Sequence, residues 1–198
     1  MNEKHLELCS SAEWADAVRR WIIPWVLDGV DLGDDVLELG PGPGRTTEVL
    51  CEMVPRLTAV ELDPSLADAL AARLSGAGGA GGGGGSAGVE VVQADATDLP
   101  YENARFSGVV SFTMLHHLPT ARDQDRLFSE AARVLRPGGV FAGTDSLDSD
   151  EFRALHLGDI CVPIDPTGLA VRLQNAGFPD PQVETNEYGT RFRGTVGA

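Results

Sequence analysis

The chain has 198 residues, of which 42% are hydrophobic and 23% charged, and this balance predicts one globular domain rather than a disordered or fibrous protein. Its formal net charge of −15 would repel nucleic acid phosphates, so no nucleic acid partner is expected. No stretch supplies the roughly 20 apolar residues of a membrane span, and the first residues lack the features of a secretion signal. We therefore expect a cytoplasmic protein without a membrane span.

Helices and strands are expected to alternate along the chain. The first helix is expected to open at residues 10–13, where capping side chains precede apolar residues at spacings of three and four, and Pro24 should kink or end it. The expected strands are residues 35–39, 57–62, 89–93, 108–114 and 140–144, and the helices between them are residues 46–53, 64–74 and 121–135. This order predicts a Rossmann-like α/β fold, a parallel sheet with helices on both faces.

The last part of the chain departs from this alternation. Residues 182–185 and 190–193 flank a turn and predict an antiparallel pair of strands. Between the fifth strand and this pair, residues 147–177 are expected to be irregular and then helical from about residue 167. Residues 75–88 are nearly all glycine and alanine and predict a flexible loop at the amino ends of the strands, away from any ligand.

Cysteine and lysine usage limits the chemistry. Cys9, Cys51 and Cys161 show no paired spacing, which argues against a disulfide framework and against a structural zinc site. We therefore expect reduced thiols and no metal. Lys4 is the only lysine, so a lysine-containing phosphate loop and a Schiff base to pyridoxal phosphate are both disfavoured.

A glycine-rich turn follows the first strand and precedes a helix, so its backbone can approach a ligand at the helix N-terminus. It has glycine at every second position: Gly40, Gly42 and Gly44. The dinucleotide fingerprint would need glycine where Arg45 stands, and Pro41 and Pro43 remove two amide donors that a pyrophosphate could use. The turn favours a nucleotide-like ligand without phosphates, and an ordinary tight turn is the alternative.

Two carboxylates end the next strands. Glu61 ends the second strand and could accept both hydroxyls of a ribose, or it could simply be solvated there. Asp95 ends the third strand and could receive the exocyclic amine of adenine, or it could cap a turn.

Taken in order, five motifs resemble those of the class I S-adenosylmethionine (SAM)-dependent methyltransferases, most closely the small-molecule branch that includes quinone-biosynthesis enzymes. The motifs are ELGPGPG at 38–44, VELD at 60–63, ADA at 94–96, SFTMLHHL at 111–118 and RVLRPGG at 133–139. The resemblance covers residues 30–197. The chain departs from the family pattern in the long glycine tract and at Phe106-Ser107, where a Phe-Asp pair is common.

The resemblance implies a seven-stranded sheet with an antiparallel last strand, SAM as cofactor and S-adenosylhomocysteine as product. It also implies the cofactor contacts. For the methionine part, Glu38 would face the ammonium group and Thr113 would line the arm. Gly40, Gly42 and Gly44 would pass under the ribose and methionine, and Glu61 would hold the ribose hydroxyls. Leu62 would pack on adenine, and Asp95 and Ala96 would hold its edge.

The acceptor is expected to be a small molecule. If it carries a hydroxyl, His116 is the predicted general base, whereas the alternative is that His116 and His117 pack or cap the following helix. The sequence lacks the Asp/Asn-Pro-Pro-Tyr and Pro-Cys motifs of nucleic acid methyltransferases. A SAM-binding module without catalysis is the competing function, and a nicotinamide-dependent reductase is disfavoured because neither tyrosine has a lysine four residues later.

We take residues 1–198 as a single domain, with residues 1–30 as a helical cap and residues 147–166 as the acceptor-site segment. The cap offers Trp14, Trp21 and Trp25 as walls of the acceptor pocket, although tryptophans at helical spacing also suit core packing. Further candidates in the acceptor-site segment are His156, Asp159 and Cys161, each of which could equally be an ordinary loop residue.

Overall fold

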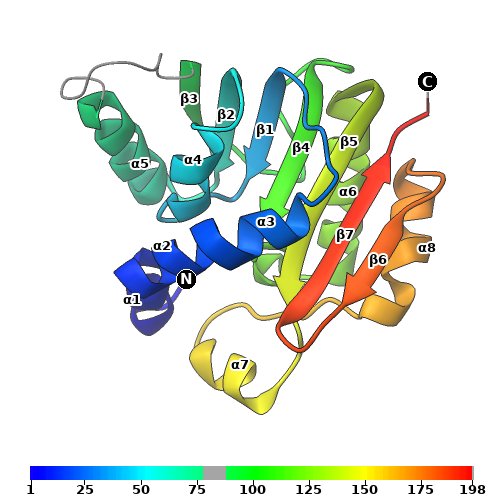
Figure 1. The fold of residues 1–198 in the computed structure, drawn as a ribbon. Helices are drawn as coiled ribbons and strands as arrows, with labels where there is room; N and C mark the ends of the chain where they lie inside the picture. The colour runs from blue at the N-terminus through cyan, green and yellow to red at the C-terminus, as the bar shows by residue number, and fades with distance from the viewer. Residues whose placement is uncertain (78–87, 198) are drawn as a thin grey trace.

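Seven strands form one sheet in the order β3-β2-β1-β4-β5-β7-β6 (Figure 1). They are seen in a computed structural model that describes residues 1–77 and 88–197. Strands β1 to β4 pair with their neighbours in parallel, whereas β7 runs antiparallel to both β5 and β6. The strands are β1 Asp35–Leu39, β2 Arg56–Glu61, β3 Gly88–Gln93, β4 Phe106–Phe112, β5 Leu135–Ser146, β6 Gln182–Thr185 and β7 Gly189–Thr195. The Rossmann-like sheet with an antiparallel last strand is therefore confirmed.

Helices pack against both faces of the sheet. They are α1 Glu3–Ser10, α2 Ala12–Ala17, the π turn η1 Val18–Ile22, α3 Ile23–Val26, α4 Arg45–Leu50, α5 Pro64–Ala77, the 3-10 turn η2 Leu115–His117, α6 Ala121–Val134, α7 Asp150–Leu155 and α8 Pro166–Ala176. In the part of the chain that the structure describes, no helix is long and apolar enough to cross a membrane.

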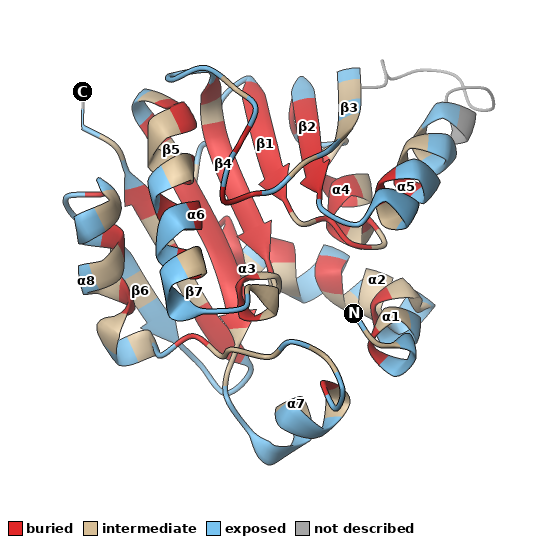
Figure 2. Ribbon diagram, turned by 180° about the vertical axis from the view of Figure 1, so that it is seen from behind, coloured by how far each residue is buried: buried red, intermediate tan, exposed pale blue. Residues whose placement is uncertain are grey.

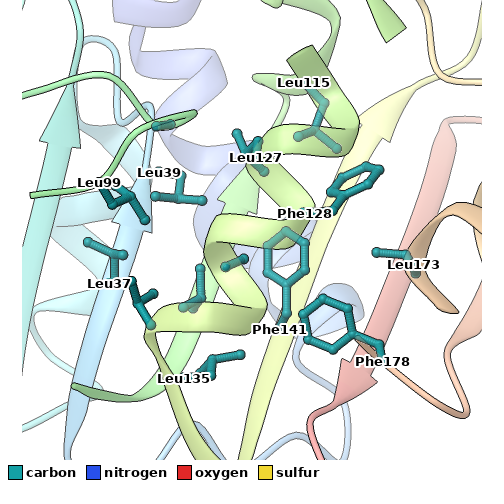
Figure 3. Close-up of a cluster of buried hydrophobic side chains, with 14 of the residues drawn as sticks. Leu37, Leu39, Leu99, Leu115, Leu127, Phe128, Leu135, Phe141, Leu173 and Phe178 are labelled. Atoms are coloured by element: carbon teal, nitrogen blue, oxygen red, sulfur yellow. The ribbon is translucent and has the colours of Figure 1, made fainter. Parts of the chain in front are cut away.

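The larger hydrophobic core lies between the sheet and helices α6 and α8 (Figure 3). Leu37 and Leu39 of β1 point into it, because alternate residues of a strand share a face. Leu127 and Phe128 of α6 belong to the same core, and the side of α6 away from the sheet is exposed to solvent (Figure 2). A second core on the opposite face joins Val36 of β1 to the N-terminal helices and to α4.

The N-terminal helices differ from the prediction. Helix α2 begins after Ser11, whose hydroxyl accepts the Trp14 amide as expected of an N-cap. The helical path does not end at Pro24, because it passes through the π turn η1, in which the Ile23 amide donates to the carbonyl of Val18, five residues back. A wider turn of this kind accommodates a proline that cannot donate to the preceding turn. Helix α1 was not predicted.

The boundaries of other helices and strands also differ from the predicted ones. Helix α5 continues to Ala77 and β3 begins at Gly88, so most of the predicted loop 75–88 lies outside the described residues. Strand β5 begins at Leu135, which pairs with Phe106 ahead of a register shift, so it is longer than residues 140–144. The segment predicted to be irregular contains the short helix α7.

Ser107 explains how the chain tolerates its departure from the Phe-Asp pair. Its hydroxyl accepts the Asp35 amide at 2.9 Å and donates to the Leu32 carbonyl at 2.8 Å. A serine therefore joins β4 to the residues that lead into β1.

Gly143 of β5 leaves no room for a side chain, and this generates a prediction. A Cβ there would lie 2.6 Å from the Phe192 ring and even closer to the Ser111 carbonyl oxygen, whereas a Cβ at Gly88 meets nothing within 4 Å. We expect Gly143→Ala to lower the free energy of unfolding by about 1–3 kcal/mol, the usual effect of overpacking. The matched change Gly88→Ala should shift it by less than about 1 kcal/mol. Urea unfolding of both variants checks this, and equal losses would contradict the packing described here.

Candidate functional site

A cleft of about 410 Å³ opens at the edge of the sheet where the parallel strands end. This is the edge at which ligands bind in open α/β sheets, because the loops after the strands converge there. Seven of the nine predicted cofactor residues line it: Gly40, Gly42, Glu61, Leu62, Asp95, Ala96 and Thr113. The remaining lining residues are Met1, Val60, Asp63, Pro64, Leu66, Ala94, Met114, His117, Leu118, Asp159 and Ile160.

The glycine turn requires glycine for two separate reasons. Gly40, Gly42 and Gly44 have φ angles of +64°, +54° and +82°, in the left-handed region that favours glycine. A Cβ at Gly40 would also clash with the Met114 side chain, and one at Gly44 would lie 2.6 Å from the Arg73 guanidinium. The turn is thus held close to its neighbours, and it brings backbone rather than side chains to the cleft.

Glu61 fixes the position of this turn. One carboxylate oxygen accepts the Gly42 amide at 2.9 Å and the other accepts the Asp63 amide at 3.0 Å, and the residue is buried. Each carboxylate oxygen can accept more than one hydrogen bond, so capacity for ligand hydroxyls remains. The bond to Gly42 was not predicted from the sequence.

Glu38 lies on β1, on the same face as Val36, and is buried. The Thr46 hydroxyl of α4 donates to its Oε1, while Oε2 has no hydrogen-bond partner within the described ranges. Burial raises the pKa of Glu38 to about 7, although the bonds from threonine oppose that rise. The result is a carboxyl group with one oxygen that a cation could satisfy.

Asp95 and Thr113 reach the cleft from the ends of β3 and β4. Oδ1 of Asp95 accepts the Thr97 amide and hydroxyl, both at 2.8 Å, so this carboxylate does cap a turn and has Oδ2 left for a ligand. Thr113 has a φ of +49°, which is strained for a β-branched residue, and its amide donates to the Thr144 carbonyl at 2.8 Å. Strain of this kind is concentrated at functional sites.

The two adjacent histidines have different surroundings. His117 is half-buried and lines the cleft, whereas His116 is fully buried and its Nδ1 lies 2.6 Å from the Asp145 carboxylate. His116 as a general base stays a prediction.

Only some of the candidate acceptor-site residues lie in the cleft. Of the candidates in the segment 147–166, Asp159 lines the cleft, whereas His156 and Cys161 do not. Trp14 and Trp25 instead pack against the second core, and Trp21 is 70% exposed.

Met1 is a cleft residue that sequence reasoning missed. It is brought there by its neighbour Asn2, whose side-chain amide donates to the Leu155 carbonyl at 2.7 Å and whose backbone amide donates to Asp159 at 2.9 Å. These bonds join residues more than 150 positions apart, so no local pattern indicates them. Met1 therefore contributes a thioether to the cleft lining, to which none of the three tryptophans belongs.

Comparisons with known proteins agree with this geometry. Residues 37–143, more than half of the chain, match the family described as a methyltransferase domain. A fatty-acid O-methyltransferase from Mycolicibacterium smegmatis is 34% identical over 114 residues, which cover 58% of this chain and 38% of that protein. A ribosomal RNA small subunit methyltransferase A from Bifidobacterium longum subsp. infantis is 38% identical over 92 residues, covering 46% and 29%. The chain thus spans less than half the length of each of these two relatives.

A solved structure shows the same fold. The SAM-dependent methyltransferase of Aquifex aeolicus superposes with a TM-score of 0.72 over 99% of both chains at 15% sequence identity. The sheet order, the glycine turn and the family match together lead to one assignment. The chain belongs to the class I SAM-dependent methyltransferases.

Proposed function

We propose that this chain binds SAM in the cleft and directs its methyl group to a small-molecule acceptor. The observation that carries the proposal is the convergence of seven predicted cofactor residues, drawn from the ends of four strands, on one cleft. The parallel strands bring these positions to one edge, and the glycine turn and the carboxylates of Glu61 and Asp95 give that edge the groups that SAM requires.

The residues present fit SAM. The free Oε2 of buried Glu38 suits the methionine ammonium, and the open backbone at Gly42, where a Cβ would meet only Met1 at 3.7 Å, leaves space for the ligand chain. Glu61 has acceptor capacity for the ribose hydroxyls, and Asp95 has a free oxygen for the adenine amine.

Bound SAM supplies a methyl group already activated by its sulfonium, so the task of this chain is to orient the acceptor and exclude water. His117 and Asp159 provide polar groups on the cleft wall, and Met114, Leu118 and Ile160 provide apolar ones. A mixed wall of this kind suits a compact acceptor with one polar group.

Charge separates small molecules from nucleic acid as acceptors. A net charge of −15 repels RNA. Binding a polyanion requires a basic surface, and a chain with 15 lysines and arginines but 30 acidic residues does not favour one. The match to the methyltransferase domain family supports catalysis over a SAM-binding module that has lost it.

Methyl-tritiated SAM tests the acceptor class. The protein is incubated with fractions of a bacterial extract that contain small molecules, RNA or protein. We expect tritium in the small-molecule fraction. Incorporation into RNA or protein instead would overturn the acceptor class while leaving SAM binding intact.

Glu61 generates a binding prediction. Glu61→Ala should weaken SAM binding by about 1–3 kcal/mol, because ligand hydroxyls and the Gly42 amide both lose their acceptor. Glu90→Ala on the exposed neighbouring strand β3 is the control and should leave affinity unchanged. Calorimetry on the folded variants measures both. Unchanged affinity in Glu61→Ala would remove Glu61 from the site.

Glu38 generates a pH prediction for the protein without ligand. Its folded-state pKa of about 7 lies above the usual 4.5, so between these values the folded chain holds a proton that the unfolded chain has lost. The free energy of unfolding should therefore fall as pH rises through this window, by on the order of 3 kcal/mol at about 1.4 kcal/mol per pKa unit.

Glu38→Gln removes this titration without changing the shape of the side chain. Chemical unfolding of both proteins from pH 4.5 to 7.5 should therefore show wild type losing stability relative to the variant as pH rises. A constant difference between the two curves would show that Glu38 is ionised in the folded protein throughout.

A further inference from the structure

All four histidines of the sequence meet at one place. They come from three segments: His5 lies in α1, His116 and His117 form η2, and His156 follows α7. One ring nitrogen from each lies within 4.8 Å of the corresponding nitrogen of every other, and the ring centroids are 4.2 to 6.1 Å apart. Every histidine of the sequence therefore contributes a ring nitrogen to one cluster.

The facing nitrogens are buried and unsatisfied. His5, His116 and His156 are 5%, 1% and 2% exposed, and His117 is half-buried. Nδ1 of His5 and Nε2 of the other three have no hydrogen-bond partner among residues 1–77 and 88–197. A buried polar atom without a partner is costly, and four of them at one point indicate that something else satisfies them.

Hydrogen bonds to the far side of two rings fix which nitrogen is free. Nδ1 of His156 lies 2.7 Å from the Phe152 carbonyl oxygen, which can only accept, so Nδ1 carries the proton and Nε2 presents a lone pair. Nδ1 of His116 is likewise bonded to the Asp145 carboxylate at 2.6 Å. Carboxylate and carbonyl partners of this kind orient the histidine ligands of metal ions and raise their basicity.

Burial first, and the neighbouring histidines second, lower the pKa of His5 to about 4 and the pKa of His117 to about 3. Two acidic side chains, Asp145 and Asp159, lie near the cluster and would balance the charge of a divalent cation.

We propose that His5, His116, His117 and His156 form a binding site for one transition-metal dication of the zinc class. Four neutral imidazoles suit zinc, cobalt, nickel or copper, whereas magnesium and calcium require oxygen ligands. Ligand bonds of about 2.0 Å place tetrahedral nitrogens roughly 3.3 Å apart, so the widest pair has to close by about 1.5 Å on binding. Four protein ligands complete a tetrahedron, so this is a closed, structural site.

The site would tie the N-terminal helix and α7 to the loop after β4. Figure 1 places α1 and α7 at the end of the sheet to which β1, β4 and β5 point, and Asn2 already joins these segments through Leu155 and Asp159. His117 is both a proposed ligand and a lining residue of the cleft, so the metal would fix that wall. The proposal departs from the sequence expectation of no metal, and it replaces the predicted role of His116 as a base, because both use the same lone pair.

The test uses the full chain without an affinity tag, stripped with a chelator and titrated with Zn²⁺ or Co²⁺. We expect one equivalent of either ion to bind and to raise the unfolding temperature, while Mg²⁺ has no effect. Co²⁺ should show the visible absorption of a tetrahedral site without the near-ultraviolet band of a thiolate ligand. No binding of Zn²⁺ or Co²⁺ at one equivalent would overturn the proposal.

Variants locate the ion. His5→Phe and His156→Phe keep a ring of similar size but lose a ligand, so each should weaken Co²⁺ binding at least tenfold. Cys161→Ser changes a thiol in the same segment outside the cluster and is the control, expected to keep the stoichiometry and spectrum of wild type. Undiminished binding in both phenylalanine variants would place the ion elsewhere.

A measurement on wild type covers the case in which a variant does not fold. With histidine labelled by ¹⁵N, one equivalent of Zn²⁺ should shift the ring nitrogen signals of all four imidazoles together. Shifts confined to one or two rings would contradict a four-histidine site. None of these experiments uses SAM. The metal site can therefore be disproved without affecting the proposed methyl transfer, and the proposed methyl transfer can be disproved without affecting the metal site.

Discussion

The bond from the Gly42 amide to the Glu61 carboxylate is the contact on which the shape of the cleft depends. It joins the turn after β1 to the end of β2, and it is buried, so water cannot readily replace it. The turn itself has three glycines at positive φ and cannot hold a fixed shape by side-chain packing. Glu61 therefore acts twice, because it holds the turn in place and also lines the cleft that the turn forms.

The rest of the site follows from the direction of the strands. Parallel strands deliver their carboxyl ends to one edge, so carboxylates and strained loop residues far apart in sequence meet there. Glu38 differs from the others because it lies within β1 and meets α4 through Thr46 rather than facing solvent. Its burial raises its pKa to about 7, so near neutral pH a large share of this carboxyl is protonated in the folded protein.

The sequence was sufficient to predict the sheet because its strands and turns rest on local patterns, whereas the cofactor contacts stay a prediction. Strand β1 and the hairpin of β6 and β7 are set by apolar alternation and turn residues, and the glycine turn by its own spacing. The N-terminal region was less predictable. Helix α1 depends on Asn2, which caps it by accepting the His5 amide, and on bonds from Asn2 to the region after α7.

The same limit applies to the histidines. Their convergence requires α1, η2 and α7 to be placed relative to one another, and spacings of 111 and 39 residues carry no periodic signal. The helical spacing of the tryptophans suited both a pocket wall and a core, and the packing of Trp14 and Trp25 places them against the core. Tertiary contacts, not residue type, decided both outcomes.

The most direct test of the account is a calorimetric comparison of three ligands on the unmodified chain: SAM, S-adenosylhomocysteine and NADH. In the proposed function, the glycine turn, Glu38 and Glu61 receive a ligand with an ammonium group, a ribose and no phosphates. We expect saturable binding of SAM and S-adenosylhomocysteine at one site and no binding of NADH. Binding of NADH alone would contradict it.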